Sequence, residues 1–407
     1  MSEFASPTIN NICGFVAATN IQSLNLSWAC DSNGVPVTNP CGTPSWGCVV
    51  CSDNTTIPGI INIIIDTLPL TGTIAESIGN ITSLEIFYIY KTLISGSIPS
   101  VLGSVSNLKE IVLDRSLLSG TIPNSLGNLL HLTYLNLGHG LLTGVLPSSL
   151  GQLDKISAFE CCENYISGSL PSSLESWTLI IELDIFVNSL SGSLPTYIGG
   201  WNRIADMFAE TNLFTGSIPS EFCQLTNIGY LYLYDSLLTG SIPECFSKMM
   251  HLDVLYLSSN CLSGAIPSAL GLLTNIDYLM MDHNCLSGTI PVELADISKL
   301  LFLSLGVNRL VGSLPTVLIS AGLPLNYLLV NNNNLNGSVA DFDLPDLTAI
   351  DLSSNSFSGI LPVPNLFVIT HTVNLSYNTF TGTIPAEFTL LAYLQTLDVS
   401  NNAALCK

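Results

Sequence analysis

Basic residues are scarce in this sequence. Nine Lys and Arg residues stand against 30 Asp and Glu residues in a chain of 407, which gives a formal net charge of −21. A nucleic-acid-binding domain carries a basic footprint that is missing here, and a polyanion or an anionic membrane surface would be repelled. The composition therefore excludes nucleic acid as a partner and leaves basic, neutral or glycan partners open.

Long apolar runs are also missing. The nearest, IPGIINIIID, is interrupted by Asn62 and ends at Asp66, well short of the roughly 18 residues needed to cross a bilayer. We therefore expect no direct membrane insertion in this chain. The start, MSEFASPTINN, lacks the basic and apolar regions of a signal peptide. Either a leader is absent from this chain or the protein is not secreted by that route.

Cysteine, in contrast, is plentiful, and the 12 residues favour a secreted or cell-surface protein without its leader. Their crowding before residue 52 indicates a disulfide-stapled cap over residues 1–57, with Cys41, Cys48 and Cys51 as disulfide candidates. A zinc knuckle is the alternative, because Cys48 and Cys51 form a CxxC, but no second CxxC and no nearby His complete four ligands. Five glycosylation sequons also fit secretion. They lie at Asn25, Asn54, Asn80, Asn336 and Asn374.

A repeat dominates the sequence. The glycine of an LxGxIP-like phrase recurs every 24 residues from Gly72 to Gly312, and then at Gly337, Gly359 and Gly382. Each unit reads approximately LxxLxLxxNxLSGxIPxxLGxLxx, which is the leucine-rich-repeat pattern: a short strand on LxL, an Asn at the turn and a return path over the outer side. One unit cannot bury its leucines alone, so the units must stack.

The predicted fold is an α/β solenoid, a curved right-handed leucine-rich-repeat superhelix with a parallel concave β-sheet and a disulfide-stapled N-terminal cap. About 15 coils occupy residues 58–402. The closing LDVSNNAALCK resembles a last repeat followed by the first cysteine of a carboxy-terminal cap, so residues 403–407 are predicted to start an incomplete cap. The chain is then a fragment of a longer protein, or another molecule covers this edge.

The phrase LSGxIPxxLGxLxxL resembles the plant-specific class of leucine-rich repeats, found in plant receptor kinases, receptor-like proteins and polygalacturonase-inhibiting proteins, and in similar proteins of some protists. The resemblance covers nearly the whole chain. SWGCVVC is similar to the WxGVxC phrase that closes the amino-terminal cap of this family, although Cys48 stands where the family usually has glycine. The resemblance also implies a disulfide between Cys223 and Cys245 on consecutive coils.

Asparagine fills the turn position in most coils, where its side chain bonds neighbouring backbone groups. We expect the coils without it to be held less tightly, or through water and hydroxyl substitutes; these carry Leu68, Thr92, Ser116, Gly140 and Ser236.

Two further pairs of cysteines lie inside the array. Cys261 and Cys285 occupy identical positions on consecutive coils, and we expect them to point inward as buried thiols. Cys161 stands at a core leucine position, and Cys162 is predicted on the inner surface between Glu160 and Glu163, which would raise the pKa of its thiol.

Aromatic and acidic residues share the predicted concave face, because the residues that flank the two strand leucines point out of the sheet. Exposed aromatics concentrated on one face are typical of interface centres. The aromatic residues are Tyr88, Tyr90, Tyr134, Phe186, Phe208, Tyr230, Tyr232, Tyr234, Tyr256, Tyr278, Phe302, Tyr327 and Tyr377. The acids are Glu110, Asp114, Glu160, Glu163, Glu182, Asp184, Asp206, Glu210 and Asp235.

Stacking places Glu160 beside Asp184, and Glu182 beside Asp206, where like charges repel unless a basic peptide, a calcium ion or a glycan sits there. The simpler alternative is that tyrosine suits a strand and that the acids keep the protein soluble.

Catalysis and cofactors are not expected. Paired carboxylates hydrolyse glycosides across a sugar, but a solenoid face offers no deep cleft to shift a pKa. The five histidines are scattered, and His139 and His283 lie six coils apart, so no metal site follows.

The sequence therefore predicts a non-enzymatic extracellular or cell-surface recognition domain that binds a protein or glycan through its concave face of tyrosines and acids. The alternative is a structural or adhesive protein that assembles with copies of itself through the solenoid ends, as an unpaired strand edge can.

Overall fold

The computed structural model describes residues 49–51, 60–319, 322–341, 343–363 and 369–406. The predicted cap residues Cys13, Cys30, Cys41 and Cys48 and the sequons at Asn25 and Asn54 lie outside these ranges. The chain divides into two units, residues 1–204 (unit 1) and residues 205–407 (unit 2), and each is described by itself.

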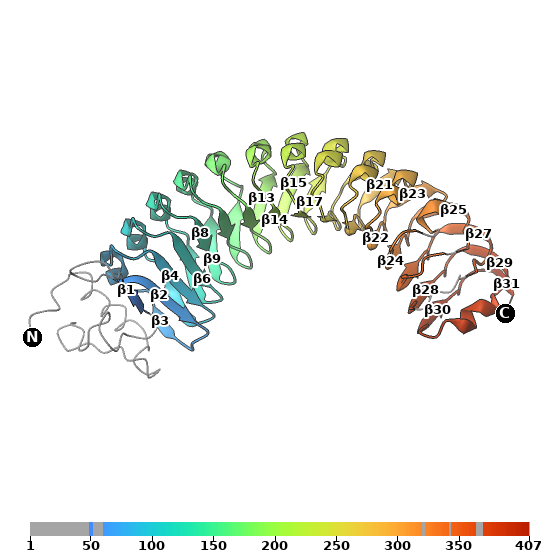
Figure 1. Ribbon diagram of the computed structural model, residues 1–407, viewed down its shortest axis with the longest axis horizontal. Coiled ribbons are helices and arrows are strands. Elements are labelled where there is room, and N and C mark those ends of the chain that lie inside the picture. The colour runs from blue at the N-terminus through green and yellow to red at the C-terminus, as the bar shows by residue number, and fades with distance from the viewer. Residues whose placement is uncertain (1–48, 52–59, 320–321, 342, 364–368, 407) are drawn as a thin grey trace, which may run out of the picture. The chain divides into compact units, whose positions relative to one another are not determined.

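In unit 1 the LxL segments form the strands of a main sheet (Figure 1). Its first strand pairs antiparallel with the second, and the later neighbours pair in parallel with residues 24 apart in register, as between Glu160 and Asp184. The strands are β1 (Val49–Cys51), β2 (Ile60–Asp66), β4 (Ile86–Tyr90), β6 (Glu110–Asp114), β8 (Tyr134–Asn136), β10 (Ala158–Glu160) and β12 (Glu182–Asp184).

A second sheet follows the turn of each coil in unit 1, and a single turn of 3₁₀ helix completes the return path. The strands are β3 (Thr71–Thr73), β5 (Leu93–Ser97), β7 (Leu117–Thr121), β9 (Leu141–Val145), β11 (Tyr165–Gly168) and β13 (Ser189–Ser193). The 3₁₀ helices are η2 (Glu76–Asn80), η3 (Ser100–Ser104), η4 (Asn124–Asn128), η5 (Ser148–Gln152), η6 (Ser172–Ser176) and η7 (Thr196–Gly200).

Unit 2 repeats this organisation. Its main sheet holds β14 (Asp206–Phe208), β16 (Tyr230–Tyr232), β18 (Val254–Tyr256), β20 (Tyr278–Met280), β22 (Phe302–Ser304), β24 (Tyr327–Leu329), β26 (Ala349–Asp351), β28 (Thr372–Asn374) and β30 (Thr396–Asp398). The strands after the turns are β15 (Leu213–Ser217), β17 (Leu237–Thr239), β19 (Ser263–Ala265), β21 (Cys285–Gly288), β23 (Arg309–Gly312), β25 (Asn334–Ser338), β27 (Ser356–Ile360), β29 (Thr379–Thr383) and β31 (Ala404–Cys406). The 3₁₀ helices are η8 (Ser220–Gln224), η9 (Glu244–Lys248), η10 (Ser268–Leu272), η11 (Val292–Asp296), η12 (Thr316–Leu318) and η13 (Ala386–Leu390).

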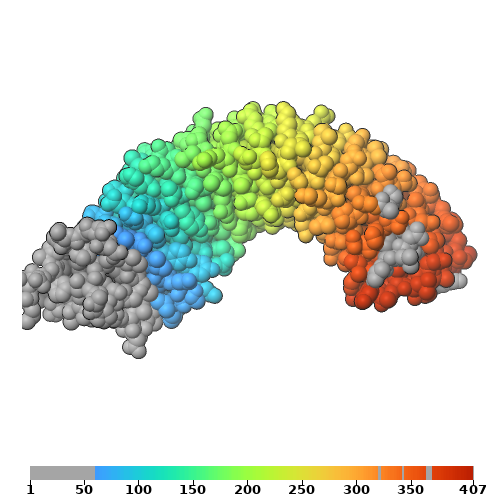
Figure 2. All heavy atoms as spheres, in the orientation of Figure 1, coloured from blue at the N-terminus to red at the C-terminus, as the bar shows by residue number. Residues whose placement is uncertain are grey.

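The return path is short because proline sets its start. Pro99 precedes η3 with φ −71°, and a fixed φ together with a missing N–H suits the first position of a helical turn. Glycine then allows adjacent coils to pack closely: a Cβ on Gly103 would lie 2.2 Å from the carbonyl oxygen of Ser125. Figure 2 shows successive coils packed directly against one another within each unit. The described residues form no α-helix, and none of their helical turns could span a bilayer.

The Asn ladder holds the turns together. Asn260 donates from Nδ2 to the carbonyl oxygens of Leu233 (2.8 Å) and Leu257 (3.2 Å), and its Oδ1 accepts from the amide of Leu238 (3.0 Å). Thr92 and Ser236, at the same position of other coils, each make one long hydroxyl hydrogen bond there, of 3.4 and 3.5 Å. Hydroxyl groups thus replace the asparagine with fewer and longer bonds.

Candidate functional site

The candidate site is the face of each main sheet formed by the residues that flank the strand leucines, here called the sheet face. In β16 the leucine at position 231 is buried in the core, whereas Tyr230 and Tyr232 on either side of it reach solvent. The strand ends at Tyr232, but Tyr234, two residues farther along, remains half-buried on the same face. Alternation along the strand therefore places the predicted tyrosines as expected.

Four aromatic rings of unit 2 touch one another on this face and are called the aromatic cluster: Phe208, Tyr232, Tyr234 and Tyr256. The parallel register pairs Phe208 with Tyr232 and Tyr232 with Tyr256. Tyr234 and Tyr256 stack with centroids 4.0 Å apart, and Tyr232 meets Phe208 edge-on at 5.0 Å. Each such ring pair stabilises the fold by about 0.5–1.5 kcal/mol more than the burial of its apolar surface alone. The contacts therefore hold the rings rigidly.

A second aromatic row lies farther along the same face of unit 2. Tyr278 stacks on Phe302 at 6.1 Å, and Phe302 stacks on Tyr327 at 4.7 Å. Tyr377 lies apart from both groups, 60% exposed at a turn position with φ 50°.

Two predicted acids of the sheet face are buried, Glu210 in unit 2 and Asp114 in unit 1, and each is only 6% exposed. Glu210 is the buried acid of unit 2. It follows β14, between two backbone hydrogen bonds that tie its coil to the next: Ala209 donates to Tyr232, and Thr211 donates to Tyr234, both at 3.0 Å. Its Oε2 is buried without a hydrogen-bond partner. Burial raises the pKa of Glu210 to about 7, although a hydrogen bond to its own backbone opposes the shift.

In unit 1 the acids are tied into a hydrogen-bond network. Tyr134 donates to Oε1 of Glu160 at 2.6 Å, and Asn136 donates to its Oε2 at 2.5 Å. Burial raises the pKa of Glu160 while these donors oppose the rise. The carboxylate predicted to need a positive or hydrogen-bonding neighbour therefore has two neutral donors from the preceding coil.

A buried acid of unit 1 is paired with a histidine that sequence reasoning left unassigned. Asp114 lies 2.8 Å from Nδ1 of His139, and Nε2 of the same ring lies 3.3 Å from Glu163. The Asp114 side chain is only 8% exposed. The 24-residue period could have predicted this neighbourhood, because it places His139 one coil after Arg115 and one coil before Glu163.

The unpaired thiols divide into two groups. Cys161 and Cys162 are buried, and burial raises the pKa of both thiols. Cys162 was predicted on the inner surface, and it does lie among sheet-face residues: a Cβ on Gly138 would lie 3.0 Å from its Sγ and 3.0 Å from the carboxylate of Asp114. These neighbours cover it, so it is only 2% exposed. Its Sγ lies 3.9 Å from Nδ1 of His139, a neighbour that the sequence reading missed.

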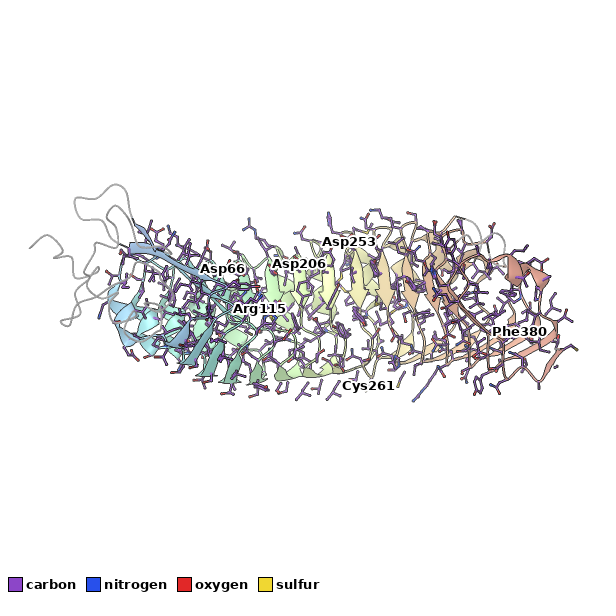
Figure 3. All side chains as sticks on the ribbon, turned by 90° about the horizontal axis from the view of Figure 1, so that it is seen from below. Asp66, Arg115, Asp206, Asp253, Cys261 and Phe380 are labelled. Atoms are coloured by element: carbon purple, nitrogen blue, oxygen red, sulfur yellow. A yellow bond between two sulfur atoms is a disulfide. The ribbon has the colours of Figure 1, made fainter. Side chains whose placement is uncertain are left out.

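The prediction that Cys261 and Cys285 point inward is wrong. Cys261 is exposed and Cys285 is partly exposed, and Figure 3 shows Cys261 near the edge of unit 2 opposite Asp206 and Asp253. The residue after the ladder asparagine points outward, and the next residue enters the core, as Leu262 does. Leucines at the same position, such as Leu93 and Leu117, are 49% and 46% exposed. Cys223 and Cys245, in contrast, form the disulfide that the family resemblance implied.

The remaining predicted site residues reach solvent on the sheet face of their own unit. In unit 1 these are Tyr88, Tyr90, Glu182, Asp184 and Phe186, and in unit 2 they are Asp206, Tyr230 and Tyr278. The ring centroids of Tyr88 and Tyr90 lie 6.2 Å apart. In unit 2, burial raises the pKa of Asp206. The sequon residues Asn80 and Asn336 are exposed, whereas Asn374 is half-buried and donates to Asp351. No group of three or more His, Cys, Asp or Glu residues among the described residues forms a metal-binding cluster.

Comparison with known proteins agrees with this architecture. The leucine-rich-repeat family model matches residues 226–286. Receptor-like protein 7 of Arabidopsis thaliana is 41% identical over 81 residues, which cover 19% of this chain and 8% of that protein, and Receptor-like protein 41 of the same plant is 43% identical over 84 residues, covering 19% and 10%. The matched segment is thus a small part of both relatives.

Solved structures match far more of the chain. The plant peptide hormone receptor RGFR1 in complex with RGF2 is 32% identical, covers 84% of this chain and 63% of its own, and has a TM-score of 0.73. The PEPR1–AtPEP1 structure is 25% identical, with coverages of 98% and 66% and a TM-score of 0.74. The Arabidopsis receptor kinase HAESA, in complex with the peptide hormone IDA and the co-receptor SERK1, is 26% identical, with coverages of 97% and 74% and a TM-score of 0.70. The fold is therefore a leucine-rich-repeat solenoid.

Proposed function

We propose that this leucine-rich-repeat chain, whose coils are similar to those of plant receptor-like proteins, is a non-enzymatic recognition domain that binds a protein or peptide partner through the sheet face of unit 2. The chain spans less than two thirds of the length of the first two solved structures that it matches. Its partner and its location are therefore proposed rather than carried over from those proteins. An extracellular or cell-surface location is part of it.

The aromatic cluster is the observation that carries the proposal. Its four rings are fixed by mutual contacts at 4.0–6.2 Å and still reach solvent. Rigid, partly exposed tyrosines lose little conformational entropy on binding, and aromatic residues dominate the energetic centres of protein interfaces. The second row of Tyr278, Phe302 and Tyr327 extends the apolar surface along the same sheet. A chain in extended conformation would fit such a surface. The similar plant peptide hormone receptor RGFR1 is in complex with RGF2, and HAESA is in complex with the peptide hormone IDA.

A random peptide library selected against the protein tests the proposal. The best peptide is then measured against the double variant Tyr232→Ala with Tyr256→Ala, and against the control Tyr165→Ala with Tyr393→Ala. The control tyrosines are 62% and 55% exposed but lie off the sheet face. We expect at least a tenfold loss of affinity in the cluster variant, since buried interface aromatics typically contribute about 1–3 kcal/mol each, and no more than a twofold loss in the control.

Equal affinities for both variants would contradict the proposal. Concentration-dependent assemblies that persist in the cluster variant, measured by light scattering, would instead favour self-association through the solenoid ends. A glycan array probed with the same two variants distinguishes a sugar ligand from a peptide ligand.

A further inference from the structure

We propose that Glu210 and the aromatic cluster form a subsite for one arginine side chain of the partner. This inference rests on the proposed function, because it names the chemical group that the sheet face recognises.

The carboxylate of Glu210 is buried. Only 6% of the Glu210 surface is exposed, and its Oε2 has no hydrogen-bond partner. A buried ionised oxygen without a donor is costly, and the cost is removed by a charged donor such as a guanidinium group. The carboxylate therefore favours a cation with N–H groups over a neutral ligand.

Unit 2 supplies no cation of its own to this carboxylate. The basic residues in its described part are Lys248, Lys299 and Arg309. Lys248 ends η9 on the return path, Lys299 donates to Asn275 at 3.0 Å, and Arg309 begins β23. None of them lies on the sheet face, so within unit 2 the positive charge must come from the ligand.

The aromatic rings beside Glu210 select the shape of the cation. Ala209 donates to the backbone of Tyr232 and Thr211 donates to the backbone of Tyr234, so Glu210 stands beside Tyr234 on the sheet face. Tyr234 in turn stacks on Tyr256. Ring faces attract cations within about 6 Å of their centroids. A guanidinium group is planar, weakly hydrated and able to stack on a ring while donating to a carboxylate at its edge, whereas an ammonium group is compact and strongly hydrated. The arrangement of ring faces next to one free carboxylate oxygen thus fits arginine better than lysine.

The chain's charge supports the same ligand class. Asp206 precedes the cluster by two residues, Asp235 is exposed next to Tyr234, and Asp282 lies two coils farther on. These acids attract a basic peptide at long range without occupying the buried position of Glu210. They also provide matched controls, because replacing any one of these aspartates with asparagine removes one negative charge near the aromatic cluster.

The test uses three probes on the full chain at pH 8: N-acetyl-arginine amide, N-acetyl-lysine amide and the neutral isostere N-acetyl-citrulline amide. Binding is followed by the NMR signals of the tyrosine rings. We expect the arginine probe to bind at least tenfold more tightly than either of the others, and Glu210→Gln to lose at least tenfold in affinity for it. Asp235→Asn should lose less than threefold. Equal binding of arginine and citrulline, or an unchanged affinity in Glu210→Gln, would overturn the inference, and equal binding of lysine would overturn the assignment to arginine.

A second measurement avoids any dependence on the variant. In the wild-type protein the ¹³C signal of the Glu210 carboxyl reports its own titration, and the arginine probe should lower its midpoint by at least one pH unit. An unmoved midpoint would also overturn the inference. If the subsite fails these tests while the variant of Tyr232 and Tyr256 still loses a selected peptide, the proposed function stands and only the arginine assignment is lost.

Discussion

Tyr234 and Tyr256 stack on the sheet face of unit 2 with their ring centroids 4.0 Å apart and their planes 25° from parallel. The two residues come from consecutive coils: Tyr256 pairs in register with Tyr232, and Tyr234 lies two residues beyond Tyr232. A stacked pair in this position is a rigid apolar platform rather than two independent solvent-exposed side chains. Glu210, which stands beside Tyr234 on the sheet face, adds a buried carboxyl group.

The stability of the free protein should fall as Glu210 ionises. Its pKa in the folded state is about 7, above its ordinary value of 4.5, so the folded state binds the proton more tightly than the unfolded state. The stabilisation that the proton on Glu210 gives the folded state is complete below about pH 4.5. It decreases as the pH rises and is lost above about pH 7. We expect wild type to lose on the order of 2 kcal/mol over this range relative to Glu210→Gln, measured by urea unfolding at pH 4.5 and pH 8. Parallel profiles for the two proteins would contradict this.

The affinity for the arginine probe should rise with pH. A cation binds the ionised carboxylate, so a pKa near 7 implies roughly a 100-fold gain between pH 5 and pH 8. The other groups near the site do not produce this profile. Tyr232, Tyr234 and Tyr256 have raised pKa values and stay neutral throughout, and the Asp235→Asn variant should keep the same slope. An affinity that is flat from pH 5 to pH 8 would show that Glu210 is not the binding group.

His139 should stabilise unit 1 much more than His283 stabilises unit 2. Both rings lie 2.8 Å from an aspartate, but His139 is 18% exposed and His283 is 59% exposed, and their aspartate partners are 8% and 22% exposed. Removing the partner of a buried charge costs more than breaking an exposed pair. We expect His139→Ala to lower the free energy of unfolding by about 1–3 kcal/mol and His283→Ala by less than about 0.5 kcal/mol. Similar losses from both variants in denaturant titrations would refute the distinction.

Alkylation should separate the four unpaired cysteines inside the array. Cys261 and Cys285 reach solvent, and Cys161 and Cys162 are buried with raised thiol pKa values. Because only an accessible thiolate reacts, iodoacetamide at pH 8 should label the first pair in the folded protein and the second pair only after unfolding. Mass spectrometry of tryptic and chymotryptic peptides reads out each site. Labelling of Cys162 in the folded protein would contradict the described packing.

The sequence predicted the columns of the sheet face well, because a 24-residue period leaves the register of parallel strands almost no freedom. The pairing of Glu160 with Asp184 and of Tyr232 with Tyr256 follows from that period alone. The outward direction of Cys261 was missed because leucine, a core residue elsewhere, also fills this outward position in several coils.

Side-chain reach explains the other differences. The sequence places Glu210 in the correct column, but it does not show that the carboxylate is buried. In the same way, the contact of Asp114 with His139 runs diagonally between coils and depends on rotamers that no periodicity encodes. The sequence therefore predicts which residues share a face, whereas their burial and partners require the structure.

Site-specific crosslinking tests the central claim most directly. The photoreactive residue p-benzoylphenylalanine replaces Tyr256 in one protein and Tyr165 in another, and each is irradiated with the selected library peptide. The account predicts a crosslinked product from position 256, its loss when unlabelled peptide is added in excess, and none from position 165. A crosslink from position 165 with none from position 256 would show that the partner binds away from the sheet face.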